Sequence, residues 1–150
     1  MKKKPPAGWP RMSASLSYDD APAAIDFLCR AFGFEVRIKI DGDDGRIEHS
    51  ELVCGKALVM VGSPRAERPW RKSPKALGGT CTQSLMLFVD DADAHAAKAK
   101  AAGATIASEP ATVDYGEDYW VDRGYEAIDL EGHHWYFVER VSEGKGAKKK

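Results

Sequence analysis

The stretch MSASLSYDDA at residues 12–21 is matched by QSLMLFVDDA at residues 83–92. In the first stretch apolar residues alternate with serines, and this period of two is typical of a β-strand with one apolar face. Each stretch ends in an Asp-Asp-Ala triplet, and an aspartate directly before a helical segment is a favoured N-cap residue. The two triplets lie 71 positions apart. The sequence therefore predicts two copies of one module, each starting with a strand, a cap and a helix.

The first copy continues with a helix and three strands. Apolar residues recur at three- and four-residue spacings through residues 22–32, which predicts an amphipathic helix that Gly33 ends. Alternation then predicts strands over 34–40, 46–54 and 56–61, with a turn at 41–45. The resulting order is strand, helix and three strands, a βαβββ module.

The second copy is predicted to repeat this order. A strand over 83–89 and an alanine-rich helix over 92–102, ended by Gly103, match the first copy. A short strand then begins at Thr105, and a loop containing Pro110 and Gly116 occupies 109–117. The module closes with a hairpin, whose strands cover 119–129 and 133–140 around Glu131 and Gly132.

The predicted domain organisation follows from this duplication. Residues 1–10 are expected to be a flexible tail and residues 141–150 a disordered basic tail. A single domain covers 11–140, with module one at 11–62, a linking loop at 63–80 and module two at 81–140. A connection as long as 63–80 marks a linker or a functional loop.

Composition limits the setting of the protein. With 150 residues, 43% of them hydrophobic and 30% charged, the chain is typical of a globular domain. It has no run of about 20 apolar residues and no secretory signal, so no membrane segment is expected. Its three cysteines, Cys29, Cys54 and Cys81, are odd in number and unevenly spaced, which favours a reducing, cytoplasmic compartment.

Charge is distributed unevenly along the chain. Seven lysines against Glu143 give the two ends a charge of +6, which leaves −7 on the remaining residues when the total is −1. An acidic body repels nucleic acid and mildly favours cationic ligands. We therefore expect no nucleic-acid partner.

Four stretches resemble the vicinal-oxygen-chelate superfamily, in particular its glyoxalase/bleomycin-resistance branch. They are YDDAPAAIDFLCRAFGFEV, GRIEHSELVCGKALVMV, LMLFVDDADAHAAKAKAAGATI and YGEDYWVDRGYEAIDLEGHHWYFVE, which lie within residues 13–140. The resemblance implies an α+β fold in which two tandem βαβββ modules form an open, cup-shaped mixed sheet with the helices outside. It also implies a ligand inside the cup and a homodimer, since members are commonly dimers.

The same resemblance implies where a metal site would be. Enzymes of the superfamily bind a divalent metal through His, Gln or Glu on the first and last strands of each module. The matching positions here are Ser13, Val59, Ser84 and Tyr136. Hydroxyl, alkyl and phenol groups are poor ligands for Mg, Mn, Fe or Zn. We expect neither a family-type metal site nor a cofactor.

The remaining candidates are polar residues on predicted strand faces. His49 and Glu51 share a face, so they are candidates for a general base with its orienting carboxylate or for ligand hydrogen bonding. The alternatives are a polar, solvent-facing side of the strand or a core histidine with its hydrogen bonds satisfied. Tyr136, a third catalytic candidate, shares a face with His134, and the resemblance places both in the cup wall. Arg123 and Tyr125 are further ligand-binding candidates that could hold an anionic or aromatic ligand, or could instead pair with the acidic body. Trp70, also a ligand-binding candidate, and Trp9 lie in polar, proline-rich segments, and either is a candidate cover of the cup mouth or of a dimer seam. His95 is expected to be an exposed helix residue and Cys29 a core residue.

Three functions stay open. The first is a metal-independent protein that binds a small molecule in the cup of a dimer, and the acidic body is compatible with a cationic, bleomycin-like compound. The second is an enzyme, either a metal-free isomerase or lyase, or a lyase or dioxygenase with a displaced metal site. The third is a module whose cup serves protein contacts. Fold alone does not choose among them.

Overall fold

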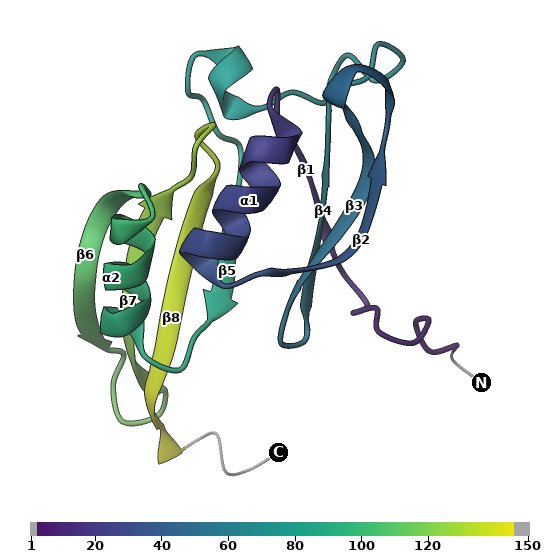
Figure 1. The fold of residues 1–150 in the computed structure, drawn as a ribbon. Helices are drawn as coiled ribbons and strands as arrows, with labels where there is room; N and C mark the ends of the chain where they lie inside the picture. The colour runs from purple at the N-terminus through teal and green to yellow at the C-terminus, as the bar shows by residue number, and fades with distance from the viewer. Residues whose placement is uncertain (1–2, 146–150) are drawn as a thin grey trace. The chain divides into compact units, whose positions relative to one another are not determined.

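The computed structural model describes residues 3–145. The chain divides into two compact units. Unit 1 comprises the residues up to Thr80 together with Leu130–Gly132, and unit 2 comprises Cys81–Asp129 and the residues from His133 onward. Each unit contains one α-helix and one open four-stranded sheet (Figure 1). Two tandem βαβββ modules of the α+β class are therefore confirmed.

Unit 1 has the strand order β1-β4-β3-β2. Strand β1 is parallel to β4, whereas β4, β3 and β2 are antiparallel neighbours. The elements of this unit are β1 (Ala14–Ser17), α1 (Ala21–Phe32), β2 (Glu35–Asp41), η1 (Asp43–Gly45), β3 (Ile47–Cys54), β4 (Ala57–Gly62) and η2 (Pro74–Leu77).

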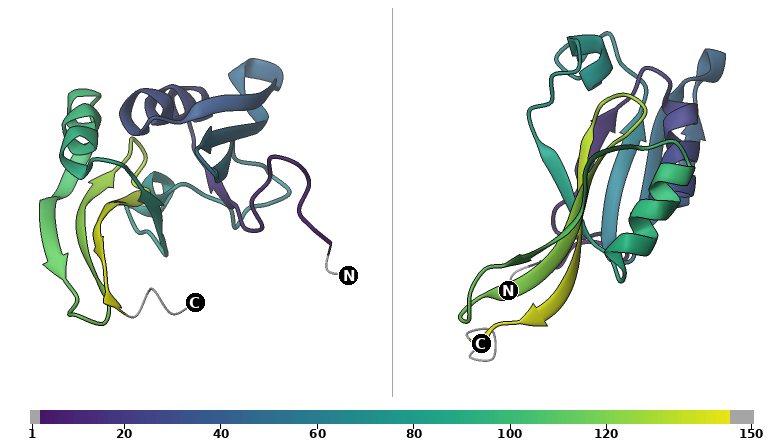
Figure 2. Two further views of the ribbon diagram at one scale, coloured as in Figure 1. Left: turned by 90° about the horizontal axis from the view of Figure 1, so that it is seen from below. Right: turned by 90° about the vertical axis from the view of Figure 1, so that its left-hand side faces the viewer.

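Unit 2 repeats this topology, with the order β5-β8-β7-β6 and a parallel β5–β8 pair. Helix α2 lies against one face of the sheet (Figure 2). The elements are β5 (Ser84–Phe88), α2 (Ala92–Ala101), β6 (Thr105–Asp114), β7 (Trp120–Ile128) and β8 (His134–Glu143). The equal strand orders confirm the predicted duplication.

Both helices begin at the predicted aspartates. The side chain of Asp20 accepts a hydrogen bond from the backbone N–H of Ala23, and that of Asp91 accepts one from Ala94. Gly33 ends α1 in the left-handed conformation, at φ 79°. The side chains of α1 that pack on the first sheet make the unit 1 core together with Leu16, Tyr18, Leu52 and Val61.

Strand β6 differs from the prediction. Residues 109–114, predicted to be loop, continue the strand, and its register with β7 shifts between Ser108 and Ala111. Because Pro110 has no backbone N–H, a bulge on an edge strand is one of the few positions in a sheet that accommodates it. The proline therefore marks an irregularity within the strand and not its end.

The terminal segments lie partly in ordered structure. Strand β8 reaches Glu143, so residues 141–143 belong to a strand and not to the predicted disordered tail. Residues 1–2 and 146–150 of the predicted tails lie outside the described residues. Across residues 3–145, neither helix is long and apolar enough to cross a membrane.

A buried carboxylate fixes the start of α1. Glu131 is 5% exposed, and its two oxygens accept the backbone N–H groups of Asp19 at 2.9 Å and Asp20 at 3.1 Å. The carbonyl of Glu131 also accepts the N–H of Lys75 at 2.8 Å. Gly132, at φ 93°, leaves room for Pro74, which a β-carbon at this position would approach to 3.0 Å. The turn 130–132 is thus hydrogen-bonded to two segments of unit 1, the start of α1 and the start of η2.

Replacing Glu131 by glutamine should lower the free energy of unfolding by about 1–3 kcal/mol, because hydrogen bonds to a charged acceptor contribute roughly this much. Urea denaturation followed by circular dichroism measures the change. Glu117→Gln is the matched control, since Glu117 is 84% exposed and pairs with Lys145; it should change stability by less than about 0.5 kcal/mol. Equal losses in the two variants would contradict the proposed role of Glu131.

Candidate functional site

One face of the first sheet carries a pocket. Its floor comes from three adjacent strands, with Ser15 on β1, Met60 on β4 and His49 on β3. These side chains lie on the open face, which we define as the face opposite the core residues Leu16, Leu52 and Val61. The pocket volume is about 530 Å³, within the range of about 300–1,000 Å³ found for small-molecule sites.

His49 and Glu51 form a pair on this face. The Nε2 atom of His49 lies 3.1 Å from one carboxylate oxygen of Glu51, and the Nε atom of Arg37 lies 3.0 Å from the other. Glu51 is only 4% exposed, and a buried carboxylate requires such partners to offset the loss of water. The prediction that His49 and Glu51 share a face is confirmed, and Arg37 is a partner that the alternation pattern did not reveal.

The N-terminal segment holds Arg37 in place. Its guanidinium donates a hydrogen bond to the carbonyl of Gly8 and lies over the ring of Trp9, 5.4 Å from the centroid. A guanidinium over an indole face is attracted by the ring quadrupole. Trp9, considered as a cover of the cup, thus contacts β2 of its own unit.

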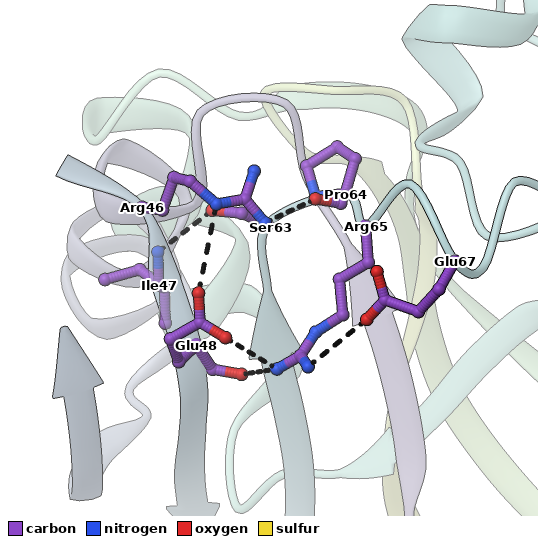
Figure 3. A network of polar contacts seen from close by, with 7 residues as sticks. All are labelled: Arg46, Ile47, Glu48, Ser63, Pro64, Arg65 and Glu67. Atoms are coloured by element: carbon purple, nitrogen blue, oxygen red, sulfur yellow. Dashed lines mark hydrogen bonds and ion pairs between the residues drawn. The ribbon is translucent and has the colours of Figure 1, made fainter. Parts of the chain in front are cut away.

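The connection after β4 forms the other side of the pocket with three arginines, Arg65, Arg68 and Arg71. Figure 3 shows how its first residues are fixed to β3. The guanidinium of Arg65 bonds the carbonyl of Glu48 and lies 3.1 Å from the Glu48 carboxylate. Beside it, Arg46 donates to the carbonyl of Pro64 at 2.6 Å. The loop therefore starts from a rigid position.

Arg71 contacts the floor, where its guanidinium donates to the hydroxyl of Ser15 at 2.6 Å. The sequence interpretation missed all three arginines, although their equal three-residue spacing was a usable signal. The acidic body of the chain predicted a mild preference for cationic ligands. The pocket is lined by three arginines and one glutamate, Glu48, and this local charge favours an anionic group instead.

Unit 2 positions Tyr136 and His134 on β8. Tyr136 is half-buried beside β7, where its hydroxyl would lie 2.8 Å from a β-carbon at Gly124. Burial raises the pKa of Tyr136, and Tyr115, which hydrogen-bonds to it, acts in the same direction. His134 is half-buried and pairs in register with Ser84 of β5. Their predicted ligand contacts stay a prediction, because the pocket described above is lined by unit 1 residues.

Arg123 and Tyr125 lie on the helix-covered face of the second sheet. Arg123 donates to both carboxylate oxygens of Asp93 in α2, at 2.6 and 2.7 Å. Tyr125 is fully buried, with its hydroxyl 2.6 Å from Nδ1 of His95. The prediction that these two residues bind ligand is therefore not supported, because alternation assigns residues to faces without showing which face the helix covers.

His95 corrects a second prediction. Expected to be exposed, it is half-buried, and its ring lies 4.4 Å from that of Phe137. An alanine-rich helix brings its backbone close to the sheet, so a polar side chain among the alanines reaches the buried aromatic residues. Trp70 shows the opposite result, since it is 74% exposed and is absent from the pocket lining. Its predicted ligand contact is not supported by this position.

Comparison with known proteins identifies the family. The model of the Glyoxalase/Bleomycin resistance protein/Dioxygenase superfamily matches residues 13–137. The chain belongs to this superfamily. An uncharacterised protein of Mycobacterium tuberculosis strain H37Rv is 34% identical over 136 residues, which cover 89% of this chain and 76% of that protein.

Solved structures of this superfamily show the same fold. TioX from Micromonospora sp. ML1 is 30% identical, with a TM-score of 0.65 over 87% of this chain and 98% of TioX. A glyoxalase I mutant from Zea mays is 19% identical, with a TM-score of 0.64 over 85% of this chain and 43% of the maize chain. The second likeness extends to the fold alone.

The residues at the positions where the resemblance implies metal ligands do not fit a divalent metal. Val59 is 6% exposed in the apolar core of unit 1, and the hydroxyl of Ser13 is buried without a hydrogen-bond partner among the described residues. Ser84 and Tyr136 supply only a hydroxyl and a phenol of raised pKa, both poor ligands at neutral pH. Within residues 3–145, no group of three His, Cys, Asp or Glu side chains could hold a metal ion.

Purified, tag-free protein should therefore contain less than about a tenth of an equivalent of metal after incubation with Mn, Fe, Ni or Zn and removal of the excess. Elemental analysis by mass spectrometry gives this ratio. A stoichiometric metal that a chelator removes would contradict the prediction that no metal binds at the positions of Ser13, Val59, Ser84 and Tyr136. His49 and Glu51 would then be the first ligands to test.

Proposed function

We propose that this superfamily member binds a small molecule on the open face of its first sheet, without the metal site of the superfamily's enzymes. The observation that carries the proposal is the pocket of about 530 Å³. It combines an apolar floor at Met60 with polar groups at Ser15, His49 and the arginines. A few polar groups placed around an apolar surface are typical of ligand sites.

The construction of the pocket supports this proposal. Its floor residues project from paired strands, and the 3.1 Å contact with Glu51 orients His49. The loop on the other side is tied to β3 through Arg65 and Arg46. Side chains held in this way lose little conformational freedom when a ligand binds, which favours affinity.

In its fuller form the proposal includes a homodimer. Edge strand β2 supports this part, because Val36, Ile38 and Ile40 are 46%, 40% and 51% exposed. Apolar side chains gathered on an exposed edge are a feature of interaction surfaces.

Filling the pocket floor tests the binding proposal. Met60→Trp should abolish the rise in melting temperature that fragment-library compounds cause in the wild-type protein, because the indole occupies the ligand volume. Met86→Trp is the matched control, since Met86 is 57% exposed on the second sheet. Differential scanning fluorimetry of the three proteins with the same compounds gives the comparison.

Compounds that stabilise wild-type protein and Met86→Trp, but not Met60→Trp, would support the proposed site. Equal stabilisation of all three proteins would place binding elsewhere. A library without any stabilising compound would contradict small-molecule binding and favour a role in protein contacts.

The His49–Glu51 pair favours a metal-free enzyme as the second candidate function. An imidazole 3.1 Å from a buried carboxylate, beside a pocket, has the geometry of an oriented general base. His49 could accept a proton from a ligand bound over Met60 while Glu51 stabilises the resulting imidazolium. Isomerisation and elimination are reactions that need such a base.

His49→Gln distinguishes this candidate from plain binding. The glutamine amide can still donate to Glu51 but cannot accept a proton, so any turnover found in wild-type protein should fall by about 100-fold or more. Turnover is followed by mass spectrometry on compounds that stabilise the protein. Undiminished turnover in His49→Gln would exclude His49 as the base. If wild-type protein binds the compounds but turns none of them over, binding is the function that remains.

A further inference from the structure

The three pocket arginines are spaced by two consecutive turns. The backbone N–H of Arg68 donates to the carbonyl of Arg65 at 3.1 Å, and the N–H of Arg71 donates to the carbonyl of Arg68 at 3.0 Å. Pro69 occupies the second position of the second turn, where proline is favoured because its φ is already set. The repeated three-residue turn brings Arg65, Arg68 and Arg71 to the same pocket.

The three guanidinium groups differ in what they contact. Arg65 is satisfied, since it bonds Glu48 and lies 3.7 Å from Glu67 (Figure 3). Arg71 has one side-chain bond, to Ser15. Neither Arg68 nor Arg71 forms an ion pair with an acidic group in the part of the chain that the structure describes. Since a guanidinium has five N–H donors, most donors of these two side chains are available to a ligand.

The local electrostatics also lack a compensating negative charge. Burial lowers the pKa of Arg71, and the neighbouring charges of Arg68 and Arg65 lower it further. The carboxylate that lines the pocket, Glu48, already pairs with Arg65. An anion placed between Arg68 and Arg71 would offset this repulsion, whereas a cation would add to it.

We propose that Arg68 and Arg71 bind the oxyanion group of a small organic acid, a carboxylate or a phosphate, whose apolar part lies on Met60. This assignment names the ligand class of the pocket and so rests on the proposed binding function. A guanidinium presents a planar fork of donors that matches the two oxygens of such a group. Ser15 and His49 flank the same space and add further hydrogen-bonding groups.

The test uses probes that share a ring and differ in charge. Benzoate and phenyl phosphate carry the two oxyanions, benzamide is the neutral analogue, and inorganic phosphate lacks the apolar part. Isothermal titration calorimetry at constant ionic strength gives each dissociation constant. At least one of the two aromatic anions should bind tenfold or more tightly than benzamide, because a charge-assisted hydrogen bond is stronger than one to a neutral acceptor.

Matched variants locate the effect. Arg68→Gln and Arg71→Gln should each weaken the tighter anion by about tenfold or more, with benzamide unaffected. Lys72→Gln removes an exposed positive charge from the same loop without touching the pocket lining, so it should bind as wild type does. Thermal melting of each variant checks that it folds. If Arg71→Gln is unstable, Arg68→Gln still tests the proposal, because Arg68 is exposed and forms no ion pair among the described residues.

The ligand class follows from which probe binds. Benzoate alone indicates a carboxylate, phenyl phosphate alone indicates a phosphate ester, and inorganic phosphate as tight as phenyl phosphate overturns the role of Met60. Benzamide binding as tightly as the anions, or anion binding unchanged in both arginine variants, overturns the anion assignment. In those cases, a fragment that stabilises wild-type protein but not Met60→Trp would still support the binding function. If no such fragment is found, both the anion assignment and the binding function are contradicted.

Discussion

The N-terminus of each helix depends on a carboxylate supplied from near the end of the second module. A helix begins with backbone N–H groups that have no partner within the helix, and a negative charge there is favoured by the helix dipole. In unit 1, Glu131 accepts the N–H groups of Asp19 and Asp20; in unit 2, Glu139 accepts that of Ala92 at 3.0 Å. This repeated bond fixes where each helix starts above its sheet.

The placement of the helix determines what the opposite face can do. Because α1 covers Leu16, Leu52 and Val61, the alternate residues of the same strands are left for polar chemistry. His49 and Glu51 project there, and the connection after β4 brings the arginines to them. The body of the chain between the two lysine-rich ends is acidic, yet the pocket is basic. Ligand preference is therefore set by a few groups within several ångströms, because solvent screens the more distant charges.

The sequence was sufficient for the architecture and for part of the site. The repeated Asp-Asp-Ala triplets located both helix starts, and the period of two placed His49 with Glu51. The same period could not show that Arg123 and Tyr125 lie under α2, because both faces of β7 carry polar groups. The sequence prediction places Pro110 in a loop, because a bulge depends on the partner strand and cannot be recognised in one strand alone. The contacts of Arg65 and Arg71 join residues 17 and 56 positions apart, so a local pattern could not predict them.

The turn at Leu130–Gly132 has a consequence for how this protein could be divided. Its two flanking strands belong to unit 2, whereas the turn itself belongs to unit 1. A fragment ending at Thr80 would keep all four strands of its sheet but would lose the carboxylate at the start of α1. The duplicated halves are therefore no longer interchangeable building blocks. Once the first copy came to rely on a residue encoded in the second, separation of the two would leave an incomplete half, and selection would maintain them as one gene.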